Sequence, residues 1–473
     1  MHGWLVPRVV LPVYERVSGR RFWTEVRRLR ARQWSPPDEL EERVVERLRH
    51  LLAHAGTHVP YYRELFRAAD LDPRSIRSVE DLARVPITTR AALRRGFPDR
   101  VTARNLPTRR RQFEMTSGSM GLPLAFYRDR GATDTWIGAY LFFLEWAGTA
   151  FWNTEVVIAG PRHFYPRRRR VGPAVAGVRR WVLGREQIWL GGPTTTVSGL
   201  WSAIVRSAYR RPYHLWAYPS YASRLARELL QGEGTLPVPP RAVIAAAETL
   251  TPVERQTIAQ AFRAPVPSHY SCVEIPRLAQ TCPDNSAVLH VNAERAIVRV
   301  VDTNGRSVAP GQAGRVLVTD LVNEVMPFIN YDPGDTATLG LECPCGRGWP
   351  TLSAIEGRTN EMLVTGDGRS VSAATLGMFL NGVCGIVPFV WEYQAIQEPD
   401  GAVELRLVPT AQFTRETGDT LARQLATLLG PDVPVRVTAI ETLERAPSGK
   451  RLVIRSAWAN APGRSMFRST PDS

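Results

Sequence analysis

The chain has one lysine, and its ammonium group could take part in catalysis in a way that the arginines could not. The chain contains 60 lysine and arginine residues, and only Lys450 is a lysine. An ammonium is a compact point charge on a flexible stem, so it can bridge several oxygens where a planar guanidinium would be too large. Lys450 is therefore a candidate catalytic residue. The alternative is that codon bias removed lysine generally and one copy survived by chance.

A hydroxyl- and glycine-rich loop is a candidate phosphate-binding segment. Its glycines let the backbone wrap closely around an anion, while hydroxyls and amide N–H groups donate to phosphate oxygens. No Gly-Lys-Ser/Thr sequence follows, so the loop is not of the Walker type. The residues expected to bind are Thr116, Ser117, Gly118, Ser119 and Gly121.

Three further segments carry polar side chains that suit nucleotide chemistry. Tyr270, Ser271 and Glu274 follow a strand-like segment and offer an aromatic ring and a carboxylate. Asp335 lies on a turn after Asn330, and Arg358 follows Gly357. Each segment could also be an ordinary surface turn when it is read alone.

In their order along the chain, these segments and Lys450 resemble the adenylate-forming superfamily of acyl-CoA synthetases and adenylation domains. The closer resemblance is to its phenylacetate–CoA ligase-like branch, which includes capsule-biosynthesis relatives. It spans about residues 35 to 455. Further segments that carry it are Val59-Pro60-Tyr61-Tyr62, Val85 to Thr89, Tyr218-Pro219-Ser220, Ala247-Glu248-Thr249-Leu250 and Cys343 to Arg347.

The resemblance implies a role for each matching residue. The 116–123 loop would close over the β- and γ-phosphates of ATP, with Glu248 and Ser271 also at the nucleotide. Tyr270 would pack on adenine, and Asp335 would accept hydrogen bonds from the ribose hydroxyls beside Arg358. Glu274 would bind Mg²⁺ and act in catalysis with Lys450, which would reach the substrate carboxylate and the α-phosphate.

The implied reaction is the formation of an acyl-adenylate and pyrophosphate. In this superfamily the small domain then rotates about a hinge, for which Asp367 is the expected position, and the acyl group passes to an acceptor. Coenzyme A is the first choice of acceptor. Transfer to an amine or a hydroxyl group, giving an amide or an ester in secondary metabolism or surface-polysaccharide modification, is the alternative.

Two residues depart from the family pattern. Met120 stands where the loop usually carries threonine, which removes one hydroxyl donor. Asn330 stands where arginine is common. These departures leave open a relative that binds its ligand without turnover.

Cysteine and histidine residues form a second constellation. Cys282, His290, Cys343 and Cys345 supply three thiols and one imidazole, the number and types of ligand that a tetrahedral zinc site uses. A closed shell of four protein ligands would make the zinc structural. The alternative is unrelated reduced cysteines and a Cys-Pro-Cys turn.

The resemblance also implies where the acid pocket lies. In the superfamily, this pocket is formed by the helix after the phosphate loop and by the segments that correspond to those before Glu248 and Tyr270. Small residues there leave room for a ring, so an aryl or arylacetic acid is the expected substrate. Trp136 and Tyr140, one helical turn apart, could equally be plain core. The expected pocket residues are Trp136, Tyr140, Tyr218, Ala245, Ala246 and His269.

The elements that must position these residues alternate between strands and helices. This alternation predicts an α/β body with mixed or parallel sheets. We expect a large N-terminal ATP- and acid-binding domain over residues 1–365, of which 1–35 form an extension. Residues 366–473 form a small mobile α+β domain that carries Lys450. The predicted helices span about 38–56, 62–69, 220–230, 252–262 and 418–429, and the predicted strands 156–160, 241–247, 296–302, 315–321, 391–397, 403–408 and 433–440.

Bulk composition restricts the partners. A net charge of +15 fits an arginine-rich proteome as well as a polyanionic partner, because the arginines are spread along the chain. Only Arg109–Arg111 and Arg167–Arg170 form runs, and no recognition helix accompanies them, so a nucleic-acid-binding protein is a rival hypothesis without support. Five cysteines, four of them close in sequence, indicate a reducing, cytoplasmic setting.

No stretch reaches the length of a transmembrane helix, and the N-terminus lacks the features of a signal peptide. A basic amphipathic N-terminal helix could still make weak peripheral contact with a membrane surface.

Overall fold

The computed structural model describes most of the chain, with gaps. The described residues are 2–108, 111–116, 123–159, 187–190, 197–208, 212–232, 234, 236–358, 361–367, 369–386, 388–446 and 449–457. The predicted phosphate-binding residues Ser117, Gly118, Ser119 and Gly121 lie outside them, as do Met120 and the arginine run 167–170.

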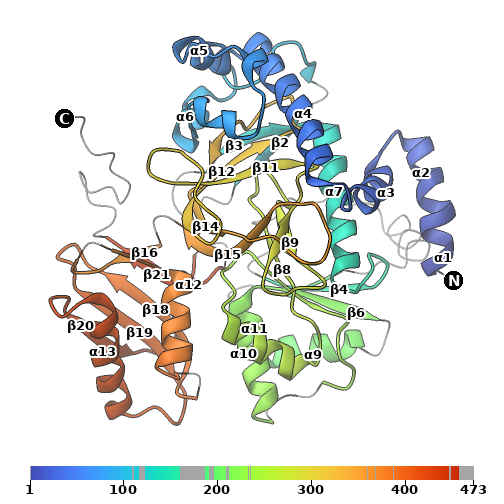
Figure 1. Cartoon of the computed structure of the whole chain (residues 1–473). Helices are drawn as coiled ribbons and strands as arrows, with labels where there is room; N and C mark the ends of the chain where they lie inside the picture. Colours follow the sequence, from blue (N-terminus) through green and yellow to red (C-terminus); the bar gives the residue numbers. More distant parts are fainter. Residues whose placement is uncertain are drawn as a thin grey trace, which may run out of the picture.

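A large mixed sheet forms the body of the protein (Figure 1). One half is parallel, and three of its strands, β5, β6 and β7, are each followed by a helix that crosses back over the sheet. Its strands, in spatial order, are β5 (Gln187–Leu190), β4 (Thr154–Ile158), β6 (Tyr213–Ala217), β7 (Val243–Ala246) and β8 (Ser268–Tyr270). The helices that pack beside them are α9 (Val197–Ala208), α10 (Pro219–Leu230) and α11 (Pro252–Phe262).

The other half of the sheet is mostly antiparallel and continues from β8 through short connections. The expectation of mixed sheets is therefore confirmed. Its strands are β9 (Ala279–Thr281), β10 (Leu289–Val291), β15 (Thr351–Arg358), β14 (Asp335–Leu339), β12 (Ala313–Asp320), β11 (Ala296–Val301), β13 (Tyr331–Asp332) and β1 (Thr88–Thr89). A separate hairpin joins β2 (Gln112–Met115) to β3 (Ala125–Arg128).

Helices from the first 146 residues cover the body. The amphipathic pattern predicted over 38–56 is α4 (Pro37–His58), whose leucines and valines are buried. The following helix, α5 (Pro60–Ala68), begins two residues earlier than predicted, because proline suits the first position of a helix. The other helical elements are α1 (His2–Leu5), η1 (Val6–Val10), α2 (Leu11–Ser18), α3 (Phe22–Arg32), η2 (Pro73–Ser75), η3 (Glu80–Arg84), α6 (Arg90–Gly96) and α7 (Arg130–Trp146).

The small domain has its own four-stranded sheet and its own apolar core. The predicted strand–strand–helix–strand order is present, with Gly401 at a φ of 96° in the turn that joins the first two strands. These elements are β18 (Val390–Gln397), β19 (Val403–Pro409), α13 (Arg415–Leu429) and β20 (Val435–Ala439). The strand β21 (Ile454–Ser456), which pairs in parallel with β18, is not among the predicted strands.

The chain passes from one core to the other upstream of the expected hinge. β15 of the large sheet ends at Arg358, and Leu363 already packs in the core of the small domain. Asp367 lies in the turn between β16 (Met362–Val364) and β17 (Ser370–Ser372), and its carboxylate accepts a 2.7 Å bond from Arg369 Nε. Asp367 therefore lies beyond the first residue of the small-domain core, and its role as the hinge stays a prediction. The helical turns α12 (Ala373–Met378) and η6 (Phe379–Val383) follow.

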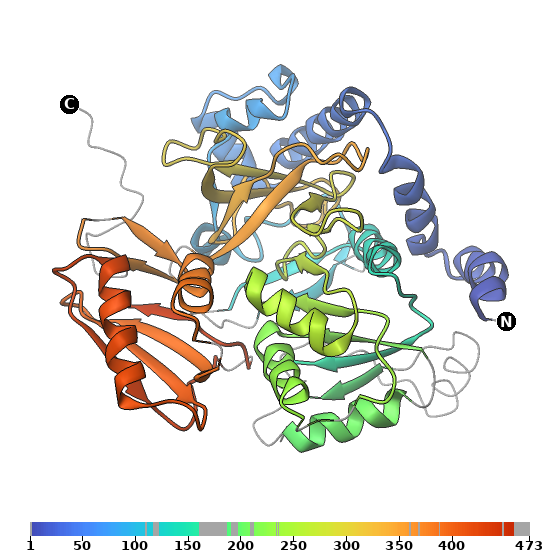
Figure 2. The same ribbon diagram turned by 60° about the horizontal axis from the view of Figure 1, so that its bottom comes forward.

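The two domains lie side by side, with α1 and α2 at the opposite edge of the molecule from the small domain (Figures 1 and 2). None of the described helices is long and apolar enough to cross a membrane.

Candidate active site

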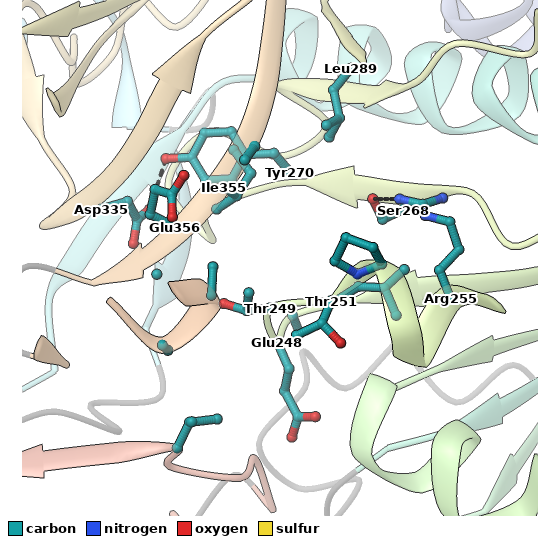
Figure 3. Close-up of a pocket in the computed structure, with 18 of the residues that line it drawn as sticks. Glu248, Thr249, Thr251, Arg255, Ser268, Tyr270, Leu289, Asp335, Ile355 and Glu356 are labelled. Atoms are coloured by element: carbon teal, nitrogen blue, oxygen red, sulfur yellow. Dashed lines mark hydrogen bonds between the residues drawn. The ribbon is translucent and has the colours of Figure 1, made fainter. Parts of the chain in front are cut away.

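A cavity of about 640 Å³ lies where strand ends of the large sheet meet the small domain (Figure 3). Residues at or just after the ends of β7 and β8 form one side, and β14 and β15 form another. The segment from Lys450 to Val453 closes it from the small domain. Residues more than 200 positions apart thus share one site. Its ionisable groups are Glu248, Arg255, His269, Tyr270, Asp335, Glu356, Arg358, Glu361, Lys450 and Arg451.

Asp335, Tyr270 and Arg358 form a connected group in this cavity. Asp335 begins β14 and pairs in register with Arg358 at the end of β15, so their side chains are neighbours, with Nε 3.4 Å from Oδ1. The Tyr270 hydroxyl donates to Asp335 Oδ2 at 2.7 Å. Burial raises the pKa of Asp335, while Arg358 and the Tyr270 bond act to lower it.

Lys450 lines this cavity from the small domain, next to Arg451. Burial and the nearby Arg358 lower the pKa of its ammonium, while Glu248, Asp335 and Glu361 act to raise it. Asp335 and Arg358 line the same cavity, and the expected contact of Lys450 with the substrate carboxylate and the α-phosphate stays a prediction. A partly desolvated ammonium interacts strongly with developing negative charge.

Glu248 connects the cavity to two elements. It follows Ala247, which has a φ of 70° and so occupies the left-handed region that favours glycine. Its carboxylate accepts bonds from the Ser220 backbone N–H at 3.0 Å and from the Arg451 backbone N–H at 2.6 Å. Glu248 therefore contacts the small domain one residue away from Lys450.

Glu274 is buried and does not itself line the cavity, although its charge acts to raise the pKa of Asp335, which does. Its Oε1 accepts bonds from the Arg90 guanidinium at 2.7 Å and from the Tyr331 hydroxyl at 2.8 Å. Because Arg90 neutralises the carboxylate, this donor set does not fit a magnesium ion as arranged.

Thr116 ends the β2–β3 hairpin, and the rest of the predicted phosphate loop lies beyond the described residues. Its Oγ1 accepts a 2.9 Å bond from the Leu124 backbone N–H. Ser271 lines the cavity, and its Oγ accepts from the Arg277 backbone N–H at 3.1 Å.

The predicted acid-pocket residues are distributed unevenly. His269 lines the cavity, and Arg277 Nη1 lies 2.8 Å from its Nε2. Burial and Arg277 lower the pKa of His269 well below its usual value. The other five do not line this cavity: Tyr140 donates to the buried Glu155, Trp136 packs beside it, and Tyr218, Ala245 and Ala246 are buried.

Asn330, the departure from the family pattern, has a structural role. Its backbone has a φ of 46°, a conformation that asparagine adopts more readily than most residues. Its Nδ2 donates to the Val85 carbonyl at 2.6 Å, and its backbone carbonyl accepts from the Thr88 N–H at 3.0 Å. The residue therefore fixes the 85–88 segment against the sheet.

The cysteine–histidine constellation converges in space. The four ligand atoms all lie within 4.8 Å of one another, on Cys282, His290, Cys343 and Cys345. The Sγ atoms of Cys343 and Cys282 are 3.9 Å apart, too far for a disulfide and close to the roughly 3.8 Å edge of a tetrahedron with 2.3 Å zinc–sulfur bonds. His290 Nδ1 lies 2.9 Å from the Trp349 carbonyl, which leaves Nε2 facing Cys345 at 3.2 Å.

Two residues of the interface between the domains were not singled out from the sequence. The Arg451 guanidinium pairs with Glu254 at 3.0 Å, and both side chains are almost fully buried. Glu254 has a sequence signal, because Thr251 and Glu254 form a capping box at the start of α11. Its pairing with a residue 197 positions away has none.

Comparison with curated proteins finds acid–CoA ligases. The chain is 26% identical over 394 residues to the phenylacetate–coenzyme A ligase of Thermus thermophilus, covering 81% of this chain and 84% of that protein. It is 24% identical to the ligase of the same name from Aromatoleum evansii, over 87% of this chain and 93% of the other. Protein CapK of Staphylococcus aureus is 22% identical, over 73% and 72%. No family model matches the chain.

Solved structures share the fold. 2-Hydroxyisobutyryl-CoA ligase with 2-HIB-AMP in the postadenylation state has a TM-score of 0.72 at 21% identity, covering 90% of this chain and 91% of the other. The same ligase with 2-HIB-AMP and CoA in the thioesterification state has a TM-score of 0.56 at 22% identity, covering 91% and 92%. The whole chain therefore superposes better on the first of these two structures than on the second. The amide bond synthetase McbA of Marinactinospora thermotolerans has a TM-score of 0.50 at 17% identity, covering 75% and 69%.

Proposed function

We propose that this chain, which belongs to the phenylacetate–CoA ligase-like branch of the adenylate-forming superfamily, is an ATP-dependent acid ligase. It would convert a carboxylic acid to an acyl-AMP and then transfer the acyl group to coenzyme A. The observation that carries the proposal is the shared cavity, in which the one lysine of the chain meets Asp335 and Arg358 from the large domain. The fold and the curated relatives support the same reaction class.

In the first step a carboxylate oxygen attacks the α-phosphorus of ATP, forming an acyl–phosphate bond and releasing pyrophosphate. Negative charge increases on the α-phosphate oxygens as this happens. The Lys450 ammonium stabilises that charge electrostatically, and its partial desolvation strengthens the interaction. Because a positioned charge acts without reorganisation, the small domain must hold Lys450 in place during the attack.

Asp335 and Tyr270 would hold the nucleoside. The Asp335 carboxylate has the capacity to accept from ribose hydroxyls while Tyr270 orients it. The Tyr270 ring would pack on adenine, and Thr116, Ser117, Gly118, Ser119 and Gly121 would enclose the outer phosphates. Magnesium would enter bound to ATP, and no step is assigned to Glu274 as its ligand, because Arg90 already neutralises that carboxylate.

An aryl or arylacetic acid is the substrate class that we propose, with His269 as the pocket residue at the cavity wall. Transfer to an amine or hydroxyl acceptor is the second candidate, because McbA shares the fold. All five cysteines are free thiols, which supports a reducing compartment and, in our proposal, the cytoplasm.

Pyrophosphate release from ATP over a panel of aryl, arylacetic and fatty acids tests the function. Release that depends on the acid and collapses in Lys450→Ala would support it and identify the substrate class. The variant Lys450→Arg keeps the charge but not its shape, and we expect it to be nearly as inactive. No release with any acid, together with no ATP binding by calorimetry, would refute the proposal.

We also propose that Cys282, His290, Cys343 and Cys345 bind one structural zinc ion. Arg347, beside the cluster, donates to Gln33 at 2.9 Å and packs over Trp34 and Trp146, so the site would tie the α3–α4 connection to the body. Metal analysis of the purified protein should find one zinc per chain. Cys345→Ser should lose it and Cys384→Ser should keep it, whereas equal zinc in both variants would refute the site.

A further inference from the structure

Backbone contacts join the two ends of the loop that carries Lys450. An isolated antiparallel bridge joins Arg445 to Arg451, and the Ala446 N–H donates to the Lys450 carbonyl at 3.0 Å. Gly449, at a φ of 80°, makes the turn before the lysine. Whatever fixes Arg445 and Arg451 therefore also fixes the backbone of Lys450.

Three polar contacts attach this loop to the large domain. The Arg451 guanidinium pairs with Glu254 at 3.0 Å, and the Arg451 backbone N–H donates to Glu248 at 2.6 Å. Arg445 Nη1 donates to Ser220 Oγ at 3.1 Å. The contacts converge from both sides of Lys450, so they determine how far it enters the cavity.

The carboxylate of Glu254 is held in an orientation that lets it pair with Arg451. Its Oε2 accepts from the backbone N–H and the hydroxyl of Thr251, both at 3.0 Å, as part of the cap of α11. Its Oε1 faces Arg451. The side chains of Glu254 and Arg451 are 3% and 4% exposed, so this ion pair exists only while the domains are together. A buried pair of this kind adds little net stability but penalises every arrangement that buries one charge alone.

We propose that Arg451 is a positioning residue that, through Glu254 and Glu248, selects the domain arrangement in which Lys450 serves acyl-AMP formation. The inference rests on the proposed function. The better match of the whole chain to the postadenylation state than to the thioesterification state supports it. Rotation of the small domain for acyl transfer would break the pair and return both charges to water.

The variant Arg451→Gln tests this inference, with Arg455→Gln as the matched control. Arg455 lies four residues away in the same segment, and its partner Glu444 is exposed and belongs to the small domain. We expect Arg451→Gln to slow pyrophosphate release at least about 10-fold and to leave thioester formation from supplied acyl-AMP within about two-fold. Arg455→Gln should change neither rate.

Two further measurements separate positioning from general damage. Glu254→Gln should reproduce the loss, and the double variant should lose no more than either single variant. Solution X-ray scattering of the substrate-free protein should show a larger radius of gyration for Arg451→Gln and for Glu254→Gln, but not for the control Arg455→Gln. Equal loss of both half-reactions, or an unchanged rate and radius, would overturn the inference. An inactive wild type would instead refute the proposed function, and the scattering would still decide the inference.

A second surface is identified by exposed apolar side chains at the N-terminus. Trp4, Leu5, Val9, Val13, Tyr14 and Val17 are all exposed on the continuous helical segment His2–Ser18, Val17 at 83%. Arg8 and Arg16 are exposed among them, and Arg8 lies over the Trp4 ring. An apolar face of this size on a surface helix indicates an interaction site.

The charge of this surface is of one sign. Glu15 is the only acidic residue in the first 24, and its carboxylate is buried, where it accepts from the Thr24 N–H at 3.0 Å and the Thr24 hydroxyl at 2.7 Å. Exposed cations, interfacial aromatic rings and valines are the composition of helices that lie in anionic bilayer surfaces. We infer that this face of α1 to α2 rests on an anionic lipid bilayer.

Sedimentation with vesicles tests this inference. The protein should bind vesicles of phosphatidylcholine with phosphatidylglycerol and should not bind phosphatidylcholine alone. Val13→Ser combined with Val17→Ser should weaken binding about 10-fold, while Val383→Ser, an equally exposed valine on the small domain, should not. No binding by the wild type, or a dimer in solution that the double variant dissociates, would overturn it.

Discussion

The large domain holds its two neighbours in different ways. The N-terminal extension shares an apolar core with it: Val6, Leu11, Trp23 and Val26 pack in the same cluster as Ile244 of β7. The core of the small domain, as far as the structure describes it, draws only on residues 363–454. Its contacts with the large domain include hydrogen bonds and ion pairs of Arg227, Arg445 and Arg451, and its α12 also packs closely against Thr251 through Gly377.

This difference explains which part can move. Separating an apolar contact exposes surface to water at a cost that grows with its area, whereas separated polar groups form new bonds with water. The extension is therefore a permanent part of the body, and the small domain is held by exchangeable bonds. A domain that must deliver Lys450 and then withdraw it needs the second kind of contact.

The largest expected effect is at the permanent contact. Trp23 is 3% exposed in the shared core, so Trp23→Ala should lower the free energy of unfolding by about 3–5 kcal/mol. Urea unfolding followed by circular dichroism measures it. Trp4→Ala, at an exposed position, should change the free energy of unfolding little. If the two variants were equally destabilised, the N-terminal extension would not be held to the large domain by its apolar core.

A core substitution in the small domain should act on that domain alone. Leu425 is fully buried in its core, so Leu425→Ala should cost about 2–5 kcal/mol. Calorimetry should show one shifted transition and one unchanged transition. A single transition that shifts as a whole would mean that the domains do not unfold separately.

Loss of one polar contact between the domains should have a smaller effect. Arg227 of α10 donates to the carbonyls of Val390 and Trp391, the latter at 2.9 Å. Arg227→Met should loosen the domains, slow pyrophosphate release and cost about 1–3 kcal/mol. Arg224→Met, whose partner Glu228 is on the same helix, is the control. If Arg224→Met slowed pyrophosphate release more than Arg227→Met does, the polar contact of Arg227 would not be what holds the domains together.

The smallest expected effect is on the pH profile. Burial, followed by Arg358, lowers the pKa of Lys450 from 10.5, so the ammonium loses its proton below that pH. Because the charged form is the active one, kcat/KM for pyrophosphate release should fall about tenfold per unit as pH rises above the lowered pKa. An alkaline limb at or above pH 10.5, with circular dichroism unchanged, would contradict the buried position.

Sequence patterns predicted local elements well where periodicity is strong. The helix over 38–56 and the strand–strand–helix–strand order of the small domain are both present, because burial of one face imposes a period. The strand β21 has only three residues, and it forms because β18 offers a free edge, which no local pattern encodes.

Within the site, residue types were predictable but partners were not. Lys450, Asp335 and Arg358 share a cavity as the ordered motifs implied. The Arg90 partner of Glu274 and the Glu254 partner of Arg451 are 184 and 197 positions away in sequence. Such pairs depend on how whole domains pack, so a single sequence carries no signal for them.

Oxygen transfer tests the central claim most directly. A substrate acid labelled with ¹⁸O in its carboxylate should be incubated with ATP, the protein and coenzyme A. The masses of the products should then be measured by mass spectrometry. Attack of the carboxylate on the α-phosphorus predicts AMP that carries one ¹⁸O atom, and none from Lys450→Ala. Unlabelled AMP, or label in inorganic phosphate with ADP as the other product, would contradict activation as an acyl-adenylate.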